Sequence, residues 1–148
     1  MLIALGAARR ALTESGGYSA SPLWQKLGLK PGQRLLLLDP PPNIDQLLVG
    51  APDGIVKTAR IAFFDAALLF ATTVRAQETK LVRVLPKFAS GGMLWLAWPK
   101  KASGVETDLT DEAIRMMGLA AGLVDIKICA IDTTWSALKF VHRHGRSL

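Results

Sequence analysis

Three short apolar runs, separated by stretches with helical patterning, constrain the fold of this chain more than any other feature. The runs are Leu35–Leu38, Ala66–Ala71 and Met93–Trp98, and each has the length of a strand. A strand without polar alternation is expected where both faces of a sheet are covered, as in a parallel sheet. The runs therefore predict the core of an α/β fold.

The segments between and after these runs predict the other layers. We expect helices over about 22–27, 43–49, 74–85 and from 111 to Gly118, with Thr73 and Thr110 as N-caps of the last two. Strands over 124–131 and 135–142 are separated by only three residues, which requires an antiparallel hairpin. The order predicts a three-layer, Rossmann-like domain with a mostly parallel sheet and a C-terminal antiparallel hairpin.

Length and charge limit the organisation of the chain. Its 148 residues suit one domain, which we place at 18–148, after a flexible or short helical N-terminal arm at 1–17. No apolar stretch approaches the roughly 20 residues of a membrane helix. The basic pair Arg9 and Arg10 follows the N-terminal apolar run, whereas a secretory signal carries its charge before that run. We therefore expect a cytoplasmic protein without membrane contact.

Two segments carry a resemblance to a known family. The segment Leu29–Leu38 resembles the start of the first strand of SAM-dependent methyltransferases, and Phe88–Ala97 resembles the turn before a later strand of that fold. The resemblance implies a methyltransferase-like fold, in which a Gly-x-Gly loop after the first strand wraps the cofactor. Here Asp39 is followed by Pro40–Pro42, and proline has no N–H to donate. We therefore predict no cofactor and do not expect SAM in the standard binding mode.

A second resemblance covers most of the chain. The segments Tyr18–Leu23, Leu96–Gly104 and Val124–Ser136 resemble a family of uncharacterised bacterial proteins, a domain of unknown function of about this size. The resemblance implies a bacterial single-domain protein and adds nothing about its chemistry.

A candidate binding site follows from the predicted sheet, because ligands of open parallel sheets bind beyond the carboxyl ends of the strands. Lysines, a hydroxyl, a flexible backbone and a helix start gather there, which is typical of a phosphate or carboxylate site. The alternative is a solvated loop beside an ordinary helix cap. The predicted ligand-binding residues are Asp39, Thr72, Trp98, Lys100, Lys101, Ser103, Gly104 and Thr110.

No catalytic residue and no metal site can be assigned from the sequence. The single cysteine, Cys129, excludes an internal disulfide and is interpreted as an inert thiol, and His142 and His144 as part of a solvated tail. Asp108, Asp111 and Glu112 are interpreted as helix-start charges.

Three functions remain open at this point. The first is a non-catalytic domain that binds a small anionic ligand or a protein partner. The second is a divergent SAM-dependent methyltransferase. The third is a nucleic-acid-binding protein, which the net charge of +6 permits, although the basic residues are scattered and no nucleic-acid motif accompanies them. The hydrophobic end of the hairpin, at Phe140 and Val141, permits pairing in a homodimer.

Overall fold

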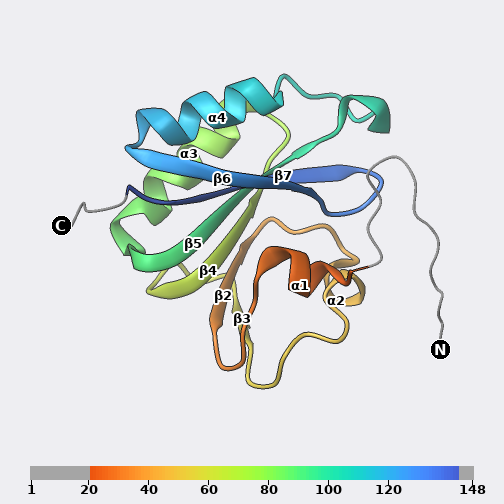
Figure 1. Cartoon of the computed structure of the whole chain (residues 1–148). Coiled ribbons are helices and arrows are strands. Elements are labelled where there is room, and N and C mark those ends of the chain that lie inside the picture. Colours follow the sequence, from red (N-terminus) through yellow and green to blue (C-terminus); the bar gives the residue numbers. More distant parts are fainter. Residues whose placement is uncertain (1–20, 144–148) are drawn as a thin grey trace.

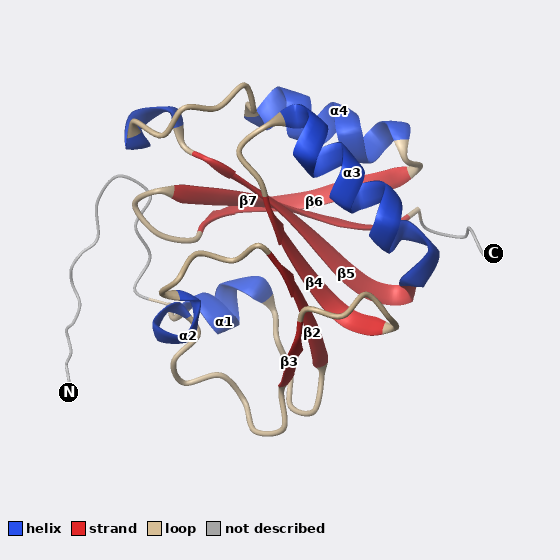
Figure 2. Cartoon of the chain, turned by 180° about the vertical axis from the view of Figure 1, so that it is seen from behind, coloured by secondary structure: helices blue, strands red, loops and turns tan. Residues whose placement is uncertain are grey.

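The computed structural model describes residues 21–143 and shows a six-stranded sheet with helices on both faces (Figures 1 and 2). The strand order is β3-β2-β4-β5-β7-β6. The strands are β2 (Arg34–Leu38), β3 (Val56–Thr58), β4 (Phe64–Phe70), β5 (Phe88–Pro99), β6 (Leu123–Ala130) and β7 (Trp135–His142). The helices are α1 (Leu23–Leu27), α2 (Ile44–Leu47), α3 (Val74–Val84) and α4 (Asp111–Ala120).

The strand directions confirm the predicted α/β fold. Strand β2 pairs in parallel with β3 and β4, and β4 pairs in parallel with β5. Strand β7 is antiparallel to both β5 and β6. The sheet is therefore mostly parallel, with an antiparallel hairpin at its C-terminal end.

Two apolar cores explain the continuous hydrophobic runs. Successive side chains of a strand point to opposite faces of the sheet. Leu36 and Trp98 belong to the core beneath α3 and α4, whereas Leu35 and Trp95 belong to the core on the side of α1 and α2. Figure 1 shows these helix pairs on opposite sides of the sheet. The central strands β2, β4 and β5 must therefore be apolar on both of their faces.

The turn that the resemblance implied within Phe88–Ala97 is not present, because β5 already begins at Phe88. Phe88 pairs with Phe64, and the next pair along the two strands joins Met93 to Ala66. The additional residues of β5 form an irregularity that includes Gly91, whose φ is 90°. Glycine adopts this left-handed backbone without steric cost.

The predicted end of the last helix at Gly118 is also wrong, since α4 continues to Ala120. Gly118 lies against the ring of Phe140 on β7, where a side chain would not fit. The absence of a side chain therefore serves helix–sheet packing here, not helix termination.

The first helix begins at Leu23, one residue later than expected, with Pro22 at the N-cap.

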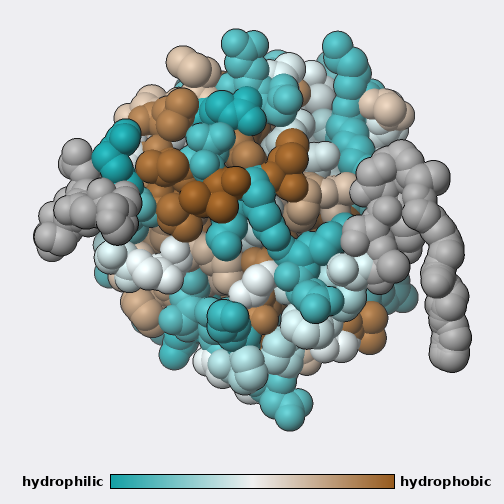
Figure 3. Space-filling view, in the orientation of Figure 1, coloured by the Kyte–Doolittle hydropathy of each residue, from teal (hydrophilic) through white to brown (hydrophobic). Residues whose placement is uncertain are grey.

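The sheet edge predicted for a homodimer is not an edge. Strand β7 lies between β5 and β6, and Phe140 is fully buried. The edge strand is β6, whose Ile126 and Ile128 are about half exposed. Figure 3 shows hydrophobic side chains at the surface over β6 and α4.

Two expectations concern the chain as a whole. No helix within residues 21–143 is long and apolar enough to cross a membrane. The predicted N-terminal arm at 1–17 lies outside the described residues.

Candidate functional site

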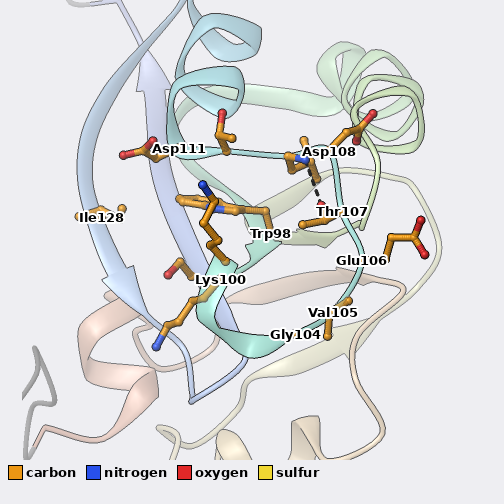
Figure 4. A pocket seen from close by; sticks show the side chains of 13 residues that line it. Trp98, Lys100, Gly104, Val105, Glu106, Thr107, Asp108, Asp111 and Ile128 are labelled. Carbon is orange, nitrogen blue, oxygen red and sulfur yellow. Dashed lines mark hydrogen bonds between the residues drawn. The ribbon is translucent and has the colours of Figure 1, made fainter.

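A pocket of about 760 Å³ opens at the carboxyl end of β5, between the following loop, the start of α4 and the β6–β7 hairpin (Figure 4). Its volume is within the range of small-molecule sites, about 300–1,000 Å³. We call it the rim pocket. Its lining residues are Trp98, Lys100, Lys101, Gly104, Val105, Glu106, Thr107, Asp108, Leu109, Thr110, Asp111, Ile128 and Ser136.

The rim pocket brings together most of the predicted site residues. Trp98, Lys100, Lys101, Gly104 and Thr110 all line it. The Thr110 hydroxyl accepts a hydrogen bond from the Ala113 N–H at 3.0 Å, which confirms the predicted cap of α4. Their role in binding a ligand remains a prediction.

Ser103 shapes the loop and is not part of the lining. Its hydroxyl donates to the Lys100 carbonyl at 2.7 Å and accepts from the Val105 N–H at 3.1 Å. Thr72 lines an adjoining depression of about 450 Å³ with Thr107 and Asp108. The Thr72 carbonyl accepts a hydrogen bond from the Thr107 hydroxyl at 2.6 Å.

Asp39 lies outside the rim pocket, at the end of β2. Its backbone has a φ of 53°, and its carboxylate pairs with Lys80 Nζ of α3 at 2.8 Å. A non-glycine residue at positive φ is uncommon. Three prolines follow, so the next three residues offer no N–H to a ligand. The residues after β2 therefore do not fit the glycine-rich cradle that holds SAM in the standard mode.

The charges of the rim pocket differ from those that the lysine pair alone suggested. Lys100 Nζ donates to the Asp132 carbonyl at 2.7 Å, so this ammonium holds the hairpin turn. Lys101 is exposed and forms no ion pair with any residue in 21–143. Three carboxylates line the same pocket, from Glu106, Asp108 and Asp111. The lining thus carries more carboxylates than free ammonium groups.

Asp108, which the sequence suggested as a helix-start charge of α4, instead makes a contact with α3 that the sequence did not predict. Its Oδ1 accepts the Val74 N–H at 2.8 Å, at the start of α3. The Thr73 hydroxyl accepts the Ala76 N–H of the same helix at 3.1 Å. Asp108 therefore attaches the loop after β5 to α3, across 34 residues of sequence. Nothing in the local sequence signals a contact over that distance.

Replacing this carboxylate tests the attachment. We expect Asp108→Ala to lower the free energy of unfolding by about 1–2 kcal/mol, because the first N–H of α3 loses its acceptor. Chemical denaturation of both proteins measures the difference. Asp53→Ala is a matched control at an exposed carboxylate without a side-chain partner among the described residues, and it should change stability by less than about 0.5 kcal/mol. Equal stability of the two variants would contradict the attachment.

Trp98 supplies the aromatic surface of the rim pocket. Its side chain is 5% exposed, and Figure 4 shows the ring between Ile128 and Asp111 on one side and Thr107 on the other. Its indole N–H makes no hydrogen bond to a residue that the structure describes, whereas Trp95 Nε1 donates to the Leu27 carbonyl at 3.2 Å. The Trp98 ring thus contributes both to the core and to the pocket.

His142 does not belong to a solvated tail. It is the last residue of β7, and its Nε2 lies 2.7 Å from the Phe88 carbonyl oxygen. Its ring also contacts the Phe88 ring, with centroids 4.4 Å apart. His142 therefore has a structural role far from the rim pocket.

Comparison with known proteins identifies the fold. No family model and no curated protein matches the sequence. A protein of the NADB-Rossmann superfamily from Streptococcus agalactiae has a similar structure, with a TM-score of 0.55, 13% identity, and coverage of 90% of this chain and 73% of that one. A possible exported protein from Bordetella parapertussis has a TM-score of 0.54 and 10% identity over 81% of this chain and 65% of the other. These likenesses show the Rossmann-like fold.

A methyltransferase is also among the structural neighbours. Magnesium protoporphyrin IX methyltransferase from Synechocystis, with bound SAH, has a TM-score of 0.47 and 10% identity over 67% of this chain. This chain spans about half of that protein, 55% of its length. The chain has a Rossmann-like fold. Its membership of the family of uncharacterised bacterial proteins and its bacterial origin stay predictions.

Proposed function

We propose that this chain is a divergent methyltransferase-like domain that binds S-adenosylmethionine, or its demethylated product, in the rim pocket. The position of this pocket carries the proposal. It lies beyond the carboxyl end of β5, at the edge where open α/β sheets hold their ligands. The loop after β2, which does not fit the standard cradle, takes no part in this mode of binding.

The lining of the rim pocket matches the chemistry of this ligand. The ligand combines an aromatic base, a positively charged sulfonium and a zwitterionic amino-acid group. Trp98 offers an aromatic surface, Asp111 and Glu106 offer negative charge, and Lys101 offers an ammonium for a carboxylate. A purely anionic ligand would meet three carboxylates in the same lining, which like-charge repulsion disfavours.

Titration calorimetry of the purified chain with S-adenosylmethionine and its demethylated product tests the proposal. We expect saturable binding of at least one of them. Asp111→Asn should weaken it about fivefold, or ~1 kcal/mol, because the pocket loses one carboxylate. No heat with either compound at millimolar concentration would overturn the proposal.

Glu112→Gln is the matched control for Asp111→Asn. Both residues lie in the first turn of α4, so both substitutions remove one charge that the helix dipole favours. Only Asp111 lines the rim pocket. We therefore expect Glu112→Gln to change the affinity less than about twofold. An equal loss in both variants would show that the effect comes from the helix and not from the pocket.

A second candidate is a non-catalytic domain that binds a small anion through Lys101. The free ammonium of Lys101 at the rim favours it. This candidate predicts that inorganic phosphate raises the melting temperature of the protein and that Lys101→Gln abolishes this increase. It also predicts that S-adenosylmethionine gives no heat of binding.

A further inference from the structure

Two lysines face each other directly on the β6–β7 hairpin. Lys127 of β6 is the register partner of Lys139 of β7. Side chains of directly opposite residues share one face of the sheet, with Cβ atoms about 5 Å apart, and like charges in this position are destabilising. The face is that of α1, because Lys139 also pairs with Trp95, which belongs to the core on the α1 side.

The end of α1 brings two further lysines to this face. Lys26 Nζ donates to the Ala130 carbonyl at 2.8 Å, so this side chain reaches from α1 to the end of β6. Lys139 Nζ lies 4.0 Å from the position that a Cβ on Gly28 would take, which places it beside the helix end. Lys30 follows Gly28 by two residues and is exposed. We call Lys26, Lys30, Lys127 and Lys139 the lysine face.

No carboxylate neutralises the lysine face within residues 21–143. The ion pairs there involve Lys57, Lys80 and Arg115 instead. Asp125 of β6 lies opposite Phe140, on the other side of the sheet, and pairs with Arg115 Nε at 3.0 Å. Burial lowers the pKa of Lys139, and the charges of Lys127 and Lys30 lower it further. The fold thus holds like charges together without an internal partner.

We propose that the lysine face is a binding site for a compact, multiply charged phosphate group, such as inorganic triphosphate or the triphosphate of a nucleotide. Lys26 is held by a backbone carbonyl, which leaves the ammonium groups of Lys30, Lys127 and Lys139 for the ligand. They gather around one cross-strand pair and one helix end, an area that suits a compact polyanion. The site lies on the opposite face of the sheet from Trp98 and does not depend on the rim pocket.

Titration calorimetry of the whole chain with sodium triphosphate, at constant ionic strength, tests this site. We expect saturable binding, weakened about tenfold by either Lys127→Gln or Lys139→Gln, as for a close charge–phosphate contact. Lys87→Gln is the control, since Lys87 is exposed and forms no ion pair with a described residue. The affinity of the Lys87→Gln protein for triphosphate should change less than about twofold.

A second measurement separates a binding role from a structural one. Without triphosphate, Lys127→Gln should melt at the same temperature as the parent or higher, because one of two opposed charges is gone. A lower melting temperature together with weaker binding would assign Lys127 to the structure and overturn the proposal. Absence of triphosphate binding, or an equal loss in Lys87→Gln, would also overturn it.

The source of the phosphate is distinguished by competition. If ATP displaces triphosphate and binds with a similar affinity, the site recognises the phosphate group that both share. If ATP binds more tightly than triphosphate, the site recognises a nucleotide. If the protein binds a labelled single-stranded RNA but does not bind triphosphate, the proposed compact site is overturned and the lysine face is assigned to nucleic acid.

Discussion

Gly118→Ala is expected to lower the free energy of unfolding by about 2–3 kcal/mol, although alanine favours helices over glycine by about 1 kcal/mol. A Cβ at this position would overlap the ring atoms Cε1 and Cζ of Phe140. Phe140 is fully buried, so its ring cannot move aside into solvent. The steric clash therefore outweighs the gain in helix propensity.

Urea denaturation of the Gly118→Ala protein measures this effect, and a second substitution tests its cause. Phe140→Leu removes ring atoms that the new Cβ would meet. The double variant should be destabilised by less than the sum of the two single variants, by about 1 kcal/mol or more. Exact additivity, or a Gly118→Ala protein as stable as the parent, would contradict close packing at this site.

Gln77→Glu is expected to have an even larger effect, about 3–5 kcal/mol at neutral pH. Gln77 of α3 is fully buried, and its Nε2 donates to the Leu69 carbonyl at 3.0 Å and the Ala97 carbonyl at 2.9 Å. These carbonyls lie near the carboxyl ends of β4 and β5. A glutamate would remove both donors and place a buried negative charge beside two carbonyl oxygens.

The loss of stability in Gln77→Glu should depend on pH. Burial raises the pKa of a carboxyl group, so the folded state favours the protonated form. The destabilisation is then smallest below the unfolded value of about 4.3 and grows as the pH rises above it. Denaturation of the variant and the parent at pH 4 and pH 7 gives the difference.

Gln77→Met is the control for this pH dependence. Methionine has a similar length and no charge, so it loses the two hydrogen bonds without adding a titrating group. Its destabilisation relative to the parent should be the same at pH 4 and pH 7. If Gln77→Glu behaved like Gln77→Met at both pH values, residue 77 would not be buried as the structure shows.

Gln77 also has one unused acceptor. Its Oε1 is the buried side-chain atom within residues 21–143 that has no hydrogen-bond partner. Leaving such an atom unpaired costs about 1–3 kcal/mol. Gln77 thus links the Leu69 carbonyl near the end of β4 to the Ala97 carbonyl of β5, the residue before Trp98 of the rim pocket.

The sequence by itself determined the elements whose signals are local. The run Leu35–Leu38 predicted a strand covered on both faces, and in the structure these residues of β2 are buried in the two cores on opposite sides of the sheet. Thr73 and Thr110 predicted the starts of α3 and α4, since a hydroxyl caps the N–H groups two or three residues later. The short connection at 132–134 predicted the hairpin, because only antiparallel strands can be joined so tightly.

Only the tertiary structure decided which side chains meet across the sheet. The insertion of β7 between β5 and β6 buried Phe140, and this ring requires a glycine at position 118 of the facing helix α4. From the sequence alone, Gly118 predicted the end of that helix. The packing of the loop after β5 on α3 turned Asp108 from a helix-start charge into a bridge between elements. The lysine face combines α1 with a hairpin about 100 residues later, and β-strand register alone placed Lys127 opposite Lys139. Such contacts depend on how whole elements pack, so no local pattern of residue types encodes them.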